Sequence, residues 1–104
     1  MRSGFGLALA LILMADNAQS ELIDAFRHRY YTLESAVQEA LGSATDSVVL
    51  WRLGDDLEQF RALFLEHSTL FVEEEQELIL QNLAAMQHDV RLQFRDVLDQ
   101  SHQG

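Results

Sequence analysis

The sequence predicts an all-α protein, a three-helix antiparallel bundle that follows a short apolar N-terminal segment. Three observations lead to this fold class. The 104 residues include no Pro and only five Gly, apolar residues recur at intervals of three and four, and no sustained alternation of apolar and polar residues favours strands. We expect helices at about 16–41, 46–67 and 69–100, joined by short turns, and a single helical domain over residues 16–104.

The apolar N-terminal segment, residues 1–15, has three possible interpretations. Arg2 precedes an apolar run over residues 5–15, which is too short to span a bilayer and resembles the hydrophobic part of a secretory signal. The segment is a cleaved signal, a retained helix that packs on the bundle, or an upstream extension of a chain that starts at Met14. We expect a cytoplasmic protein, and a periplasmic one if the segment is a signal peptide.

The first helix of the bundle is predicted from a capping pattern and an apolar stripe. Asp16, with Gln19 three residues later, has the form of a capping box and predicts the helix start. Gly42 is a natural stop at the other end. Apolar residues at helical spacing then mark the face that should be buried: Leu22, Phe26, Tyr30, Leu33, Val37 and Leu41.

The second helix should begin after a short polar connection, with Thr45 or Asp46 as its N-cap. Gly54 lies inside the helical pattern and costs about 1 kcal/mol relative to Ala. A start at Asp55, after an extended linker, is therefore the alternative. The stripe of this helix consists of Val49, Leu53, Leu57, Phe60 and Phe64.

A third helix is predicted because its apolar stripe is out of phase with that of the second. A break near His67 resolves the conflict, with Ser68 or Thr69 as the N-cap, whereas one long bent helix is the alternative. The third stripe consists of Ile79, Leu83, Met86, Val90, Phe94 and Val97. If the three stripes pack together, Phe26, Phe60 and Val90 must face the core.

The charge of the chain indicates the class of its partner. The net charge is −10, and residues 54–104 carry eleven acids and three Arg, which gives −8 in the second half alone. Nucleic acid and anionic membranes are disfavoured as direct partners by this charge. A protein with a basic or amphipathic surface fits it better, and simple solubility is the alternative explanation.

Two groups of charged residues are candidates for partner binding. Glu73, Glu74 and Glu77 belong to an acidic run, which either contacts a basic partner or is a solvated helix start. Arg27 and Tyr31 belong to the basic and aromatic cluster of the first helix, and Arg and Tyr are enriched in binding hot spots. Alternatively, Arg27 pairs internally with an acid of another helix.

The end of the third helix supplies two further candidates for partner binding. That helix is expected to be longer than the second, so Leu92 and Leu98 should overhang the bundle. Apolar side chains that overhang a bundle are covered by the N-terminal segment, a second copy or a partner.

No catalytic, cofactor or metal site is expected. The chain has no Cys and no Gly-rich phosphate loop, and its nearest approach to a Glu-x-x-His metal motif pairs Asp99 with His102. We therefore expect a small acidic helical protein-binding module without catalytic activity: an adaptor, a chaperone-like subunit or an inhibitor. A homodimer is a further alternative for its assembly. The alternatives are an exported periplasmic helical bundle and an acidic nucleic-acid mimic that inhibits a nucleic-acid-binding protein.

Overall fold

The protein is built from three α-helices and one short 3-10 turn. The computed structural model describes the backbone of residues 2–43 and 46–103 and the side chains of residues 18–43 and 46–100. The helices are α1 (Arg2–Leu41), α2 (Ser47–Glu66) and α3 (Glu73–Gln103), with the 3-10 turn η1 (Ser68–Leu70) between the last two. The described residues contain no strand, so the all-α three-helix fold is confirmed.

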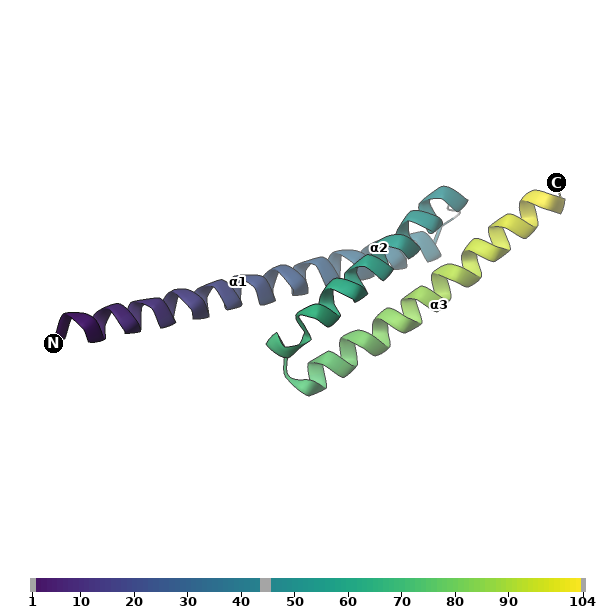
Figure 1. Cartoon of the computed structure of the whole chain (residues 1–104). Helices are drawn as coiled ribbons and strands as arrows, with labels where there is room; N and C mark the ends of the chain where they lie inside the picture. The colour runs from purple at the N-terminus through teal and green to yellow at the C-terminus, as the bar shows by residue number, and fades with distance from the viewer. Residues whose placement is uncertain (1, 44–45, 104) are drawn as a thin grey trace.

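The molecule is long and narrow, at 79 × 21 × 19 Å. Helices α2 and α3 form an antiparallel hairpin, and the C-terminal half of α1 packs along it (Figure 1). With 40 residues, α1 is about 60 Å long, twice the roughly 30 Å of the 20-residue α2. Its N-terminal half therefore extends beyond the turn of the hairpin, while the end of α3 extends in the opposite direction (Figure 1).

The predicted helix start at Asp16 is wrong, because α1 begins at Arg2 and continues through that position. A capping box needs a non-helical residue at the cap. The preceding residues are mainly Leu and Ala, which are strong helix formers, and no Pro interrupts them. The helix therefore extends through the apolar segment rather than starting after it.

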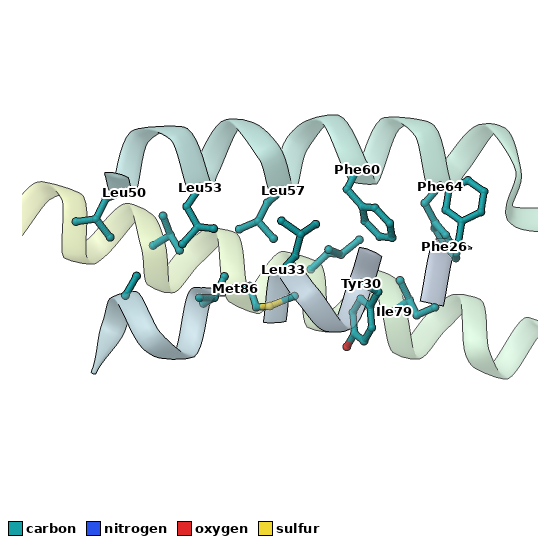
Figure 2. Close-up of a cluster of buried hydrophobic side chains, with 14 of the residues drawn as sticks. Phe26, Tyr30, Leu33, Leu50, Leu53, Leu57, Phe60, Phe64, Ile79 and Met86 are labelled. Atoms are coloured by element: carbon teal, nitrogen blue, oxygen red, sulfur yellow. The ribbon is translucent and has the colours of Figure 1, made fainter. Parts of the chain in front are cut away.

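The core lies where the three predicted stripes meet. Phe26, Phe60 and Val90 are all buried, as predicted. Figure 2 shows Leu50, Leu53, Leu57, Phe60 and Phe64 in a row along one side of α2, facing side chains from the other two helices. The buried residues are Phe26, Tyr30, Leu33, Val37, Ala40, Leu50, Leu53, Leu57, Phe60, Phe64, Phe71, Ile79, Leu83, Met86 and Val90.

The start of α2 agrees with the capping prediction. Asp46 is the N-cap, and its Oδ1 accepts a hydrogen bond of 3.0 Å from the backbone N–H of Val49. The other candidate cap, Thr45, lies outside the described residues. The helix runs through Gly54, so the alternative start at Asp55 is wrong.

The predicted break near His67 is confirmed, and the predicted cap of the next helix is wrong. Ser68 and Thr69 lie in η1, and α3 begins only at Glu73. The physical reason is Phe71, which is buried: the chain turns once more to bring this ring into the core before α3 starts. Gln76 fixes that turn, because its Nε2 donates a 2.7 Å hydrogen bond to the carbonyl of Phe71.

An aromatic cluster closes the bundle at the turn of the hairpin. The ring of Phe26 lies edge-on to Phe60, Phe64 and Phe71, with centroid distances of 6.0, 6.1 and 6.0 Å. The centroid of the His67 ring lies 5.5 Å from the centroid of the Phe26 ring. Aromatic pairs in such geometry stabilise beyond the area they bury, so Phe26 ties α1 to both sides of the turn.

Candidate functional site

Arg27, a predicted partner-binding residue, is held by an internal ion pair. Its Nε and Nη2 donate to Oε1 and Oε2 of Glu75, both at 2.9 Å, and its guanidinium lies 5.9 Å from the ring centre of Phe71. This confirms the alternative that Arg27 pairs with an acid of another helix. The hydrogen bond to Glu75 raises the pKa of Arg27, and the same bond lowers the pKa of Glu75.

Tyr31 is exposed on α1, beside the buried Tyr30. The two rings lie 5.4 Å apart in an edge-to-face arrangement. Tyr30 accepts a 2.7 Å hydrogen bond at its hydroxyl from Nδ2 of Asn82 on α3. Burial raises the pKa of Tyr30, and the bond from Asn82 acts in the opposite direction. Tyr31 is thus an exposed ring that packs against the buried ring of Tyr30.

The acidic run starts α3, as its position near a helix N-terminus predicted. Glu73, Glu74 and Glu75 lie in the first turn, where the helix dipole stabilises negative charge. Glu73, Glu74 and Glu77 are exposed, whereas Glu75 is half-buried against α1. Sequence reasoning did not single out Glu75, because its pairing depends on how α1 is rotated relative to α3, and residue spacing within one helix does not report that rotation.

The outer side of α3 carries exposed apolar residues between acids. Leu78, Ala85 and Leu92 are seven residues apart and so lie nearly in line, and the two leucines are 57% and 46% exposed. Exposed acids flank this line. We call this surface the acidic face of α3. It consists of Glu74, Glu77, Leu78, Ala85, Asp89, Leu92 and Asp96. It contains three of the predicted partner-binding residues.

Leu98, another predicted residue, lies on a different side of α3, in line with Phe94 and Arg91. Leu92 and Leu98 are both exposed, as predicted, whereas Phe94 and Val97 are partly buried against the core. The two leucines therefore lie on different sides of α3 rather than together, and Leu98 does not line the groove described next.

The second surface is an open groove of about 450 Å³ between α2 and α3, called the α2–α3 groove. Its lining includes the buried side chains of Leu50 and Val90 and the rings of Trp51 and Phe94. Trp51 is 62% exposed, a large apolar area for a soluble surface. The groove is lined by Leu50, Trp51, Gly54, Asp55, Glu58, Arg61, Gln87, Val90, Arg91 and Phe94.

Gly54 shapes this groove by having no side chain. A Cβ at this position would meet only Cγ1 of Val90, at 3.9 Å, which is an ordinary van der Waals contact. The space above Gly54 is therefore open to a ligand. The groove could not be predicted from the sequence, because a Gly inside a helical pattern indicates only lower helix stability and Trp51 fits either a core or a surface position.

Few of the charges are neutralised inside the bundle. Among residues with described side chains, Glu75 is the only acid in an ion pair. Within the same residues, no group of three His, Asp or Glu side chains is arranged to hold a metal ion. The described helices also include none that is both long enough and apolar enough to cross a membrane.

Comparisons of the chain with protein-family models, with curated proteins and with solved structures give no match.

Proposed function

We propose that this protein is a small non-catalytic protein-binding module that binds a basic amphipathic helix on the acidic face of α3. The observation that carries the proposal is the line of Leu78, Ala85 and Leu92, which is exposed and flanked by acids that form no ion pair with any described side chain. Apolar residues at intervals of seven fit the apolar stripe of one partner helix.

The acids would contribute mainly to the rate and the specificity of binding. A net charge of −10 attracts a basic partner over a long range and repels acidic ones. The leucines would contribute affinity, because covering them removes apolar surface from water. Such an interface weakens as salt rises, since exposed charges are screened within about 8 Å at physiological ionic strength.

The test uses a synthetic helical peptide of about four heptads with Leu along one side and Lys and Arg on the other. Isothermal titration calorimetry should show binding to the unmodified protein, and Leu92→Glu should weaken it at least tenfold. Leu63→Glu is the matched control, because Leu63 is equally exposed but lies on α2. No binding of the peptide, or equal weakening by both substitutions, would contradict the proposal.

The proposal assigns the protein to the cytoplasm. Arg2 and the apolar run of residues 5–15 keep export to the periplasm as the alternative. N-terminal sequencing of the native protein decides between them: a terminus at Met1 or Met14 excludes a cleaved signal, and a terminus just after Ala15 assigns the protein to the exported class.

A further inference from the structure

We propose that the α2–α3 groove binds an α-amino acid with an aromatic side chain. The groove is separate from the acidic face of α3, and the proposal does not rest on the function assigned to that face. Two features of the lining carry it: charged side chains of both signs that form no ion pair, and the rings of Trp51 and Phe94. An α-amino acid carries an ammonium group, a carboxylate and a side chain on one carbon, so it can meet both features at once.

The charge of the groove differs from that of the whole chain. Its lining contains two acids, Asp55 and Glu58, and two basic residues, Arg61 and Arg91, so its formal charge is zero while the chain carries −10. None of the four belongs to the one ion pair that the described side chains form. A zwitterion finds partners for both of its charges here, whereas a ligand with a net charge also meets two side chains of its own sign.

The register of the two helices places an acid and an Arg at the same level. Gly54 lies opposite Val90, since a Cβ at residue 54 would be 3.9 Å from Cγ1 of Val90. Asp55 and Arg91 are the next residues of the two helices, so each lies only about 1.5 Å from this level along its helix. Both line the groove, and they form no ion pair with each other. A ligand can therefore contact both from between the helices.

The two sides of the groove suit the two ends of a zwitterion. On α2, Glu58 follows Asp55 by three residues, so the two carboxylates are neighbours on one helix face and can both accept from an ammonium group. Nε2 of Gln59 donates a 2.8 Å hydrogen bond to Oδ2 of Asp55, which restrains that carboxylate. On α3, the guanidinium of Arg91 matches the geometry of a carboxylate and can donate two hydrogen bonds to it.

The aromatic residues lie on one side of this charged level. Trp51 precedes Gly54 by about 4.5 Å along α2, and Phe94 follows Val90 by about 6 Å along α3. Because α2 and α3 run antiparallel, these two shifts point in the same direction (Figure 1). The side chain of an amino acid held by its two charges can therefore pack against both rings, where an aromatic side chain gains the most.

The size and the charge order of the groove disfavour larger occupants. Its volume of about 450 Å³ falls in the range of small-molecule sites, roughly 300–1,000 Å³. Along the groove the charged residues follow the order Arg91, Asp55, Glu58 and Arg61. A twofold axis across its centre would set Arg91 against Arg61 of a second copy, so the groove is not complementary to itself. An apolar helix would leave all four charges covered and unpaired.

Trp51 reports binding directly, because it is the only Trp of the chain and lines the groove. We expect L-phenylalanine to cause a saturable shift of the Trp51 emission to shorter wavelength as its ring excludes water. Phenethylamine has the same ring without the carboxylate, and hydrocinnamate has it without the ammonium group. Each should bind at least tenfold more weakly than phenylalanine, because each leaves one charged side of the groove without a partner.

Substitutions assign the two charges to their partners. Arg91→Gln and Asp55→Asn should each weaken phenylalanine binding at least tenfold, and Gly54→Leu should abolish it by filling the groove. Arg95→Gln and Asp56→Asn are the matched controls, because they remove the same charges from the same helices at positions that do not line the groove. Both controls should bind phenylalanine as the unmodified protein does. Circular dichroism of each variant confirms that it is folded.

Three outcomes would overturn the proposal. The first is the absence of a saturable change in Trp51 emission with phenylalanine. The second is binding of phenethylamine or hydrocinnamate as tight as that of phenylalanine, which would show that the groove does not recognise a zwitterion. The third is equal weakening by Arg91→Gln and Arg95→Gln. Binding of the basic peptide to the acidic face is measured separately, so either proposal can fail without the other.

Discussion

Asn82 donates a 2.7 Å hydrogen bond through Nδ2 to the hydroxyl of Tyr30, and this bond joins α3 to α1 over a separation of 52 residues. Tyr30 is buried and Asn82 is half-buried, and no buried side-chain polar atom among the described residues lacks a partner. Burial raises the pKa of Tyr30, which favours the neutral phenol.

We expect Tyr30→Phe to destabilise the protein by about 1 kcal/mol, because it removes the hydrogen bond and leaves the Asn82 amide with one partner fewer. Asn82→Ala should have a similar effect. The double variant should cost less than the sum of the two, since the second substitution finds the bond already gone. Urea unfolding of all four proteins gives the coupling free energy, and strict additivity would show that the bond contributes nothing.

The ring of Phe26 packs against three aromatic rings at the turn of the hairpin. We expect Phe26→Ala to lower the free energy of unfolding by about 3–5 kcal/mol, because it opens a cavity among Phe60, Phe64 and Phe71. Such a loss is a large share of the total stability of a domain this size. Denaturant unfolding followed by circular dichroism measures it.

Tyr31→Ala is the control for Phe26→Ala. The Tyr31 ring is also aromatic and also on α1, but it is exposed and contacts only the ring of Tyr30 among the described aromatic pairs. Its loss should change stability by about 0.5 kcal/mol or less. If the two substitutions have equal effects, the aromatic cluster is not what holds α1 to the hairpin.

The elements that could be predicted from the sequence are those that local patterns determine. The phase change between the stripes of Phe64 and Ile79 predicts the break between α2 and α3, because a single straight helix would bury charge. The cap at Asp46 follows from residue type and position. The cap at Ser68 was predicted by the same rule and is wrong, because burying Phe71 determines where the turn ends, and that is a tertiary requirement.

Contacts between helices required the structure. Arg27 and Glu75 are 48 residues apart, and the sequence offered several acids as partners for this Arg. Which acid it meets depends on the rotation and the axial shift of α1, both set by packing around Phe26. The α2–α3 groove likewise depends on how far apart two helices lie at Gly54, and no pattern within either helix encodes that distance.

The ion pair between Arg27 and Glu75 should make stability depend on pH in the acid range. Its hydrogen bonds lower the pKa of Glu75 in the folded protein, so the stabilisation is present above the unfolded value, about 4.3 for Glu. It is lost as pH falls through the lower, folded pKa. Glu75→Gln should therefore be less stable than the unmodified protein near pH 7, and the difference should shrink to zero in strong acid.

Thermal unfolding at a series of pH values checks this expectation. The effect near pH 7 should be small, because both side chains are partly exposed and solvent screens the pair. Glu74→Gln is the control, since Glu74 is exposed in the same turn and forms no ion pair among the described residues. A difference between unmodified protein and Glu75→Gln that persists unchanged in acid would show that its origin is packing rather than charge.

Gly54→Ala should stabilise the protein by about 1 kcal/mol, because Ala restricts the unfolded chain and favours the helix interior. The new Cβ would lie 3.9 Å from Cγ1 of Val90, close enough for favourable contact and too far for a clash. Gly42→Ala is the matched control: there a Cβ would lie 3.2 Å from the backbone carbonyl of Gln38, so part of any gain is offset by crowding. We therefore expect Gly54→Ala to raise the melting temperature more than Gly42→Ala does. If Gly54→Ala is neutral or destabilising, the missing side chain does not limit the stability of the helix at this position.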